Sequence, residues 1–211
     1  MFDSPCPDKS KHMKQVVAIH GGRTFDTYEH YIWSLENREI TIDTFKGQKD
    51  WRDSLQKELG EDFEVFAPKM PNGNNAVYIE WKIWFERMAG FLHDDVVLIG
   101  HSFGGIFLAK YLSETPFTKK VKAVFLVAVP FDDVQPEEFL TGFELPASLE
   151  KFSAQASKIY LIFSKDDPVV PFTQASKYKN ALPNAQIVTF KDRQHFNQEF
   201  FPELVKLIKK V

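Results

Sequence analysis

The stretch Val96–Gly105 constrains the fold of this chain most, because a strand pattern ends there on a turn pattern and a helix pattern follows at once. The apolar, mostly β-branched run Val96–Ile99 leads into the pentapeptide Gly-His-Ser-Phe-Gly at 100–104. Glycines on both sides of Ser102 carry no Cβ, so strand and helix can approach closely. The pattern predicts a buried strand, a sharp turn and a helix, with Ser102 in a strained backbone conformation with φ above zero.

A serine at such a corner is placed for nucleophilic attack, because its Oγ stands clear of the sheet. The helix is expected to begin at Phe103, so the Phe103 N–H and the positive end of the helix dipole point toward an oxyanion formed beside Ser102. A Gly-x-Ser-x-Gly match can arise by chance, but the preceding strand, the following helix and the further glycine at 105 are the context that a working corner requires. We interpret Ser102 as a nucleophile and Phe103 as an oxyanion donor.

Strand and helix patterns alternate along the rest of the chain, which predicts one parallel sheet with helices on both faces and right-handed crossovers. The expected spatial order of the six strands is 2-1-3-4-5-6, since the loop after the first strand must lie next to the serine corner. Residues 28–59 are predicted to form two helical pieces that cover one face of the sheet. Besides the strand before Ser102, the apolar runs are 15–20, 64–68, 121–129, 159–163 and 186–190.

Residues 130–157 interrupt this alternation with mixed prolines, acids and phenylalanines, a stretch too long for a tight turn and too irregular for one helix. We interpret it as a small cap insertion over the site, in which Phe131 and Phe143 bind substrate and close a small pocket. Polar residues and prolines dominate 1–14, which we expect to be an N-terminal tail. Residues 15–211 are then expected to form a single domain.

Composition excludes several classes of function. The chain of 211 residues has a formal net charge of −3 and scattered basic residues, so no nucleic-acid partner is expected. No apolar run is long enough to span a membrane or to act as a signal peptide, and the single cysteine, Cys6, cannot form an internal disulfide, so we expect a cytoplasmic protein. Metal-ligand spacing and a dinucleotide fingerprint are both lacking, so no metal or cofactor is expected.

Candidate reactive residues follow four of the predicted strands. Gly22 follows the first strand, Ser102 the third, Asp167 the fifth and His195 the sixth, and the carboxyl ends of parallel strands meet at one edge of a sheet. A serine hydroxyl needs an imidazole to take its proton, and that imidazole needs a carboxylate to fix its tautomer. The sequence therefore predicts Ser102, His195 and Asp167 as a catalytic set, with Gly22 as second oxyanion donor and Arg23 beside it against the substrate.

Four acids could orient the histidine: Asp132 and Asp133 after the fourth strand, and Asp166 and Asp167 after the fifth. The stretch Pro168–Pro171 stiffens the loop behind the second pair and biases Asp167 toward an extended conformation, which favours Asp167. Asp166 is expected to face solvent or to cap the turn. The remaining acids keep open an alternative placement after the fourth strand.

Four motifs carry a resemblance to a known family: His-Gly-Gly at 20–22, Gly-His-Ser-Phe-Gly at 100–104, Asp-Asp-Pro-Val-Val-Pro at 166–171 and His-Phe-Asn at 195–197. Together they resemble the small α/β-hydrolases of the retinoblastoma-binding-protein type and their bacterial relatives, from about residue 15 to the end. The resemblance implies an α/β-hydrolase fold and a triad of Ser102, Asp167 and His195. The chain departs from the family in a first loop with a single His-Gly-Gly and in a longer segment at 28–48.

These observations lead to two functional hypotheses. The first is a serine hydrolase that cleaves a small carboxylic ester, thioester or activated amide through an acyl-enzyme, with a small-molecule acyl substrate and water as its partners. The alternative is a catalytically weak or inactive protein of the same fold that acts as a binding module, because fold does not fix function. In either case a protein partner is not identified by the sequence.

Overall fold

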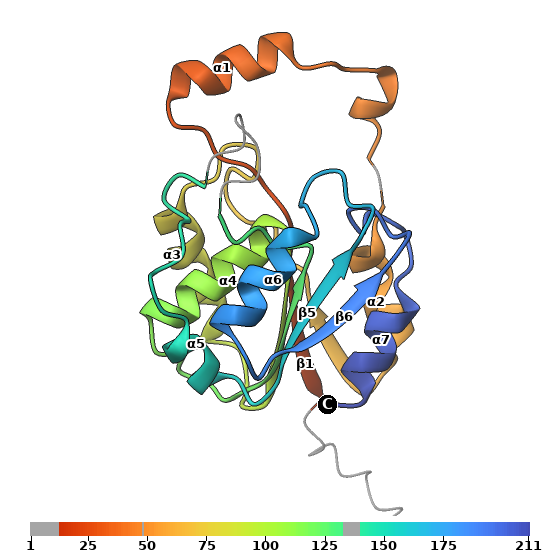
Figure 1. Ribbon diagram of the computed structural model, residues 1–211. Helices are drawn as coiled ribbons and strands as arrows, with labels where there is room; N and C mark the ends of the chain where they lie inside the picture. Colours follow the sequence, from red (N-terminus) through yellow and green to blue (C-terminus); the bar gives the residue numbers. More distant parts are fainter. Residues whose placement is uncertain (1–12, 48, 133–139) are drawn as a thin grey trace, which may run out of the picture.

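A parallel sheet of six strands lies at the centre of the computed structural model, which describes residues 13–47, 49–132 and 140–211 (Figure 1). The spatial order is β2-β1-β3-β4-β5-β6, and all neighbouring strands pair in parallel. This confirms the predicted order and places the loop after β1 beside the corner after β3. The strands are β1 (Lys14–Ile19), β2 (Phe63–Phe66), β3 (Val96–His101), β4 (Val121–Val127), β5 (Ile159–Ser164) and β6 (Gln186–Phe190).

Helices cover both faces of this sheet, as Figure 1 shows, with α3, α4 and α6 on one side and α2 and α7 on the other. Each side has its own hydrophobic core, and the central strand β3 is buried along its whole length because both of its faces are covered. The helices are α1 (Tyr28–Asn37), the 3-10 helix η1 (Ile42–Phe45), α2 (Trp51–Leu59), α3 (Tyr78–Ala89), α4 (Phe103–Glu114), α5 (Glu150–Gln155), α6 (Thr173–Ala181) and α7 (Pro202–Lys209).

The contact between β3 and α4 explains why glycines flank the corner. A Cβ added at Gly100 would lie 2.4 Å from the Cα of Gly105, and one added at Gly104 would lie 2.5 Å from the carbonyl oxygen of Ile19. Real Cβ atoms do not approach backbone so closely. The glycines therefore allow the helix to start directly against β1 and β3, with Ser102 between them.

The segment 28–59 is only partly as predicted, because its two helices behave differently. Trp51, Leu55 and Leu59 of α2 are buried at four-residue spacing, so α2 covers a face of the sheet. No residue of α1 is buried, and Figure 1 shows α1 above the carboxyl ends of the strands, away from both faces. The prediction that both helices cover the sheet was wrong for α1, whose apolar and polar residues are too mixed for a core-facing stripe.

The segment 130–157 also differs from the prediction of a cap. Residues 133–139 lie outside the described residues, but Phe143, Leu149 and Phe152 are buried in the same core as α4. The short helix α5 packs beside α4, and the Ser157 N–H donates to the Val121 carbonyl. The described C-terminal part of this segment therefore extends the core at the side of the molecule, because its phenylalanines find partners there.

The predicted tail at 1–14 falls largely outside the described residues. Lys14 already belongs to β1 and pairs with Phe63 of β2, so the ordered strand starts one residue earlier than predicted. Cys6 lies outside the described residues. Within the described ranges, no helix is both long and apolar enough to cross a membrane.

Candidate active site

Ser102 occupies the corner between β3 and α4 with φ 51° and ψ −120°. Its N–H donates to the Val127 carbonyl at 2.8 Å, and its own carbonyl accepts from the Gly105 N–H at 2.9 Å. A non-glycine residue in such a conformation stores roughly 1–3 kcal/mol and persists because its surroundings fix it. The prediction of a positive φ at Ser102 is confirmed.

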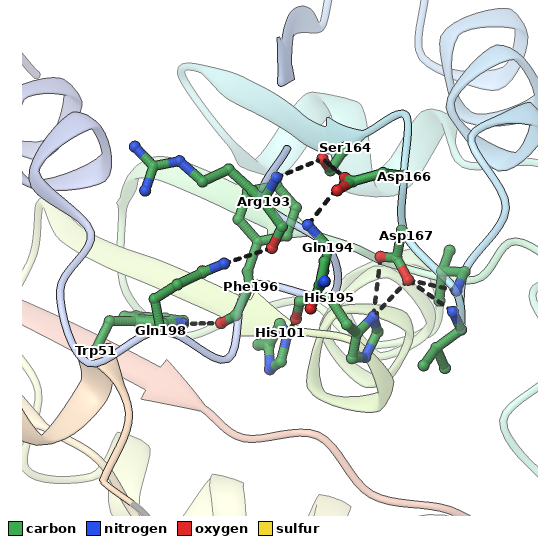
Figure 2. A network of polar contacts seen from close by, with 12 residues as sticks. Trp51, His101, Ser164, Asp166, Asp167, Arg193, Gln194, His195, Phe196 and Gln198 are labelled. Atoms are coloured by element: carbon green, nitrogen blue, oxygen red, sulfur yellow. Dashed lines mark hydrogen bonds and ion pairs between the residues drawn. The ribbon is translucent and has the colours of Figure 1, made fainter. Parts of the chain in front are cut away.

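His195 and Asp167 are joined by their side chains (Figure 2). The Nδ1 of His195 lies 2.9 Å from Oδ2 and 3.1 Å from Oδ1 of Asp167, whose side chain is only 1% exposed. The same Oδ1 accepts from the N–H groups of Val169 and Val170 at 2.8 and 2.9 Å, so the stretch after Pro168 holds the carboxylate. A carboxylate can only accept here, so Nδ1 carries the proton and Nε2 of neutral His195 is left as an acceptor.

The other candidate acids are engaged elsewhere. Asp166 is exposed, and its Oδ1 accepts from the Ser164 hydroxyl at 2.5 Å and from the Gln194 N–H at 2.9 Å (Figure 2). The Ser164 hydrogen bond holds the pKa of Asp166 below its ordinary value. Asp166 thus caps the turn before His195, as expected. Asp132 binds Gln174 and Lys177 of α6, and Asp133 lies outside the described residues.

His101, the residue before Ser102, holds the loop of His195 from below. Its Nε2–H donates to the His195 carbonyl at 2.7 Å, and its Nδ1 accepts from Nη1 of Arg52 at 2.9 Å, an assignment that follows because a carbonyl only accepts and a guanidinium only donates. Burial, with the neighbouring His195 and Arg52, lowers the pKa of His101 well below its ordinary value. Trp51 adds a hydrogen bond from its indole N–H to the Phe196 carbonyl at 3.0 Å (Figure 2).

The sequence does not predict this link through His101. Arg52 and the His195 loop are distant from His101 in the chain, and only the fold brings the three together. His20, the residue before Gly21, accepts from the Met70 N–H at 2.8 Å through Nε2, and its ring packs edge-on to Trp81. Burial lowers its pKa as well.

The loop after β1 lies directly beside the corner. A Cβ added at Gly21 would lie 3.3 Å from the Cβ of Ser102, and one at Gly22 would lie 2.9 Å from the Gly73 carbonyl oxygen. The Arg23 N–H donates to that same carbonyl at 3.1 Å, which occupies the backbone donor after Gly22. Gly22 therefore stays the candidate for second oxyanion donor, and Phe103 is the first residue of α4, as predicted.

A cavity of about 770 Å³ opens above Ser102. Five of the predicted site residues line it: Gly22, Arg23, Ser102, Phe103 and His195. Ser102 and His195, which are far apart in sequence, therefore face one space, with Asp167 behind the histidine.

Two predicted substrate-binding residues are not among those that line the cavity, which corrects both assignments. Phe143 is fully buried, with its ring centroid 4.7 Å from that of Phe103 and 5.4 Å from that of Trp81. Phe131 packs edge-on to Tyr178 at 5.0 Å. Phe143 belongs to the core and Phe131 packs against it, whereas Pro130 and Leu140 line the cavity from this part of the chain.

One face of α1 forms a wall that the sequence pattern did not predict. Four of its lining residues follow helical spacing i, i+3, i+4 and i+7, and Arg38, the residue that caps the end of α1 in an extended conformation, lines the cavity beside them. These positions are polar or aromatic, so they carry no core-facing signal that would identify them. They are His30, Trp33, Ser34, Asn37 and Arg38. Among the described residues, no group of three or more His, Cys, Asp or Glu side chains could hold a metal ion.

The parallel sheet, its strand order and the strained serine corner define an α/β-hydrolase. The family model described as serine hydrolase matches residues 44–202, and the chain belongs to this family of enzymes. It is 32% identical over 151 residues to the serine hydrolase RBBP9 of Rattus norvegicus, a match that covers 70% of this chain and 77% of the relative. The resemblance to retinoblastoma-binding-protein-type hydrolases is thereby confirmed.

Solved structures agree on the fold. The ydeN gene product of B. subtilis superimposes with a TM-score of 0.73 at 20% identity, covering 94% of this chain and 98% of that one. A structure from a study of carboxylesterases of the thaumarchaeon Nitrososphaera gargenis gives a TM-score of 0.60 at 16% identity, covering 95% and 90%. At such identities the likeness extends to the arrangement of strands and helices alone.

Proposed function

We propose that this serine hydrolase cleaves a small carboxylic ester, thioester or activated amide with Ser102 as nucleophile, His195 as general base and Asp167 as the orienting acid. One observation carries the proposal: a buried carboxylate holds Nδ1 of His195, while His195 and Ser102 line the same cavity. This arrangement leaves Nε2 as the proton acceptor on the cavity side. The strained backbone of Ser102 supports its assignment as the nucleophile.

The proposed reaction has two half-reactions. Nε2 of His195 takes the proton of the Ser102 hydroxyl while Oγ attacks the substrate carbonyl, and Asp167 stabilises the imidazolium. The carbonyl oxygen becomes an oxyanion, which accepts hydrogen bonds from the N–H groups of Phe103 and Gly22. The tetrahedral intermediate then collapses, and His195 returns the proton to the leaving alcohol, thiol or amine. Water attacks the acyl-enzyme by the same steps and releases the acid.

The cavity favours a small substrate. Its volume of about 770 Å³ falls in the range of roughly 300–1,000 Å³ that is usual for small-molecule sites. Since the Nitrososphaera structure comes from work on carboxylesterases, an oxygen ester is the first class to try. A binding module with a weak or inactive site remains the alternative outcome of the test.

A fluorophosphonate probe tests the proposal. The native protein is expected to be labelled covalently, and Ser102→Ala to lose the label. Ser113→Ala is the matched control, because Ser113 is also buried on α4 but donates to the Ala109 carbonyl within the helix. Folding of each variant is checked by circular dichroism. Absence of labelling in native, folded protein would contradict the proposed reaction and favour the binding module.

A further inference from the structure

The polar wall of the cavity is cationic. Arg23, Arg38 and Arg52 all line it, and no described lining residue is an aspartate or glutamate. This contrasts with the whole chain, which has 29 acidic and 26 basic residues. The cavity wall is thus positively charged in a chain whose net charge is slightly negative.

The side chains of two of these arginines have no protein partner in the described part of the chain. Arg52 forms an ion pair with Asp50 and donates to His101, so its guanidinium is already used. The side chains of Arg23 and Arg38 have neither a hydrogen bond nor an ion pair with any described residue. Their charges are therefore available to a ligand in the cavity.

The acidic residues of α1 lie away from the cavity, whereas the residues at its C-terminal end face it. Asn37, the last residue of α1, and Arg38, which caps the helix, line the cavity, but Glu29 and Glu36 do not line it and are exposed. Since no residue of α1 is buried, this face is not shaped by core packing. Side chains that donate hydrogen bonds therefore face the cavity that also holds the proposed nucleophile Ser102. Such donors are suited to bind a hydrogen-bond acceptor on the substrate.

From these observations we infer that the substrate carries an anionic group, a carboxylate or a phosphate, which Arg23 and Arg38 bind while its scissile carbonyl lies at Ser102. A guanidinium offers paired donors that match both anions. Arg23 directly follows Gly22 and Arg38 caps the C-terminal end of α1, so the two would approach the anion from different walls of the cavity. The inference rests on the proposed function and narrows its substrate class.

The test compares matched esters on native enzyme and on Arg23→Gln/Arg38→Gln. For an anion on the acyl side, the pair is mono-p-nitrophenyl glutarate and its methyl ester. For an anion on the alcohol side, 4-acetoxybenzoate and 4-acetoxyphenyl phosphate are compared with neutral 4-acetoxybenzamide. The measured quantity is kcat/KM for the anionic ester divided by kcat/KM for the neutral ester. The two esters differ in intrinsic reactivity, but this difference cancels when the ratio of a variant is compared with that of the native enzyme.

The ratio is expected to favour an anionic ester in the native enzyme and to fall about tenfold or more in the double variant, because charged hydrogen bonds are lost. Arg87→Gln, which removes the same charge from the exposed surface of α3, should keep the native ratio. The carboxylate and phosphate arms show which anion fits. A ratio unchanged in the double variant, or a native enzyme without preference for either anion, would overturn the inference.

A binding measurement separates this inference from the proposed reaction. Monomethyl glutarate and phenyl phosphate are titrated calorimetrically into Ser102→Ala, with dimethyl glutarate as the neutral control. Binding of an anion that disappears in Ser102→Ala/Arg23→Gln/Arg38→Gln supports the anion site even if no ester is hydrolysed. Lack of anion binding overturns it, whereas loss of hydrolysis and labelling with anion binding intact counts against the proposed reaction alone.

Discussion

The carboxyl edge of the sheet and the helix α1 face the same cavity but are held in place in different ways. At the sheet edge, Ser102 sits between buried elements, and hydrogen bonds from His101 and Trp51 hold the His195 loop. The helix α1 has no buried residue, and Trp33 is 52% exposed although it lines the cavity. Packing thus fixes the residues assigned to chemistry, whereas the wall assigned to recognition is attached mainly through the chain at its ends.

This difference suggests a division of roles. Bond-breaking groups need fixed geometry, which a close-packed core provides. A wall outside the core can change its residues at little cost in stability, because surface substitutions away from special features are usually within about 0.5 kcal/mol. Substitutions at the sheet edge should therefore affect turnover or folding strongly, and substitutions on α1 should affect substrate binding.

The largest effect is expected from the acid behind His195. Asp167→Asn should lower kcat by up to about 10⁴, because an amide at this position favours the wrong imidazole tautomer. Asp166→Asn should leave kcat within a few fold, since Asp166 only caps the turn through Ser164 and Gln194. Hydrolysis of a p-nitrophenyl ester by both variants and by Asp132→Asn measures the contrast. If Asp132→Asn lost its activity while Asp167→Asn kept a native kcat, the orienting acid would have to be assigned to the loop after β4.

A second test compares a glycine at the sheet edge with a glycine in the segment that follows α1. Gly100→Ala should lower the free energy of unfolding by about 3 kcal/mol or more, because the new Cβ meets backbone atoms of α4 that cannot move aside. Gly47→Ala, in the segment between η1 and α2, should change it by less than about 0.5 kcal/mol, since nothing lies within 4 Å of the added Cβ. Urea denaturation of both variants gives the values. Equal destabilisation would show that the sheet edge and the segment after α1 are packed alike.

Periodicity and turn chemistry predicted the sheet because the inner strands β1, β3, β4 and β5 are buried almost throughout, and because glycine, proline or aspartate follows each strand within a few residues. The same reasoning predicted the set of Ser102, Asp167 and His195, since each follows a strand and strand ends converge. This reasoning failed where the local sequence pattern does not indicate whether a side chain is buried in the core. Phe143 looks like a pocket residue by its position after the fourth strand, but its ring packs on Trp81 and Phe103.

The wall formed by α1 could not be predicted for a related reason. A helical stripe is recognisable when it is apolar, because core burial selects such residues. The lining face of α1 is polar and aromatic, which is equally compatible with a solvated face. Only the position of the helix above the strand ends shows that His30, Trp33 and Arg38 face the cavity.

The third prediction uses the buried histidine below the His195 loop. The folded protein keeps His101 neutral, whereas the unfolded chain takes up a proton below about pH 6.5, so the unfolded state binds more protons there. The contribution of neutral His101 to the free energy of unfolding should be fully present above that pH. It should fall below it, with a slope of up to about 1.4 kcal/mol per pH unit. His20, whose pKa is also lowered, adds in the same direction.

Urea denaturation between pH 7 and pH 5 measures this slope, a window that stays above the ordinary carboxyl titrations. The His101→Gln variant should show a smaller slope than the native protein, because it cannot take up the proton in either state. His30→Gln is the control, since His30 lies on α1 outside the core. A slope unchanged by His101→Gln would mean that other groups set the pH dependence at the sheet edge.

The smallest change in stability is expected for a substitution on α1. Such a substitution should affect substrate binding and not folding. Trp33→Ala should shift the free energy of unfolding by less than about 0.5 kcal/mol, because the ring is half exposed and contacts mainly the neighbouring His30. It should raise KM several fold while kcat stays close to native, since the ring lines the cavity but lies outside the proposed catalytic set. Leu35→Ala, on the same helix but not at the cavity, should leave KM and stability near native. If Trp33→Ala instead lowered kcat and stability together, α1 would be part of the fixed catalytic framework, and the division between the two regions would fail.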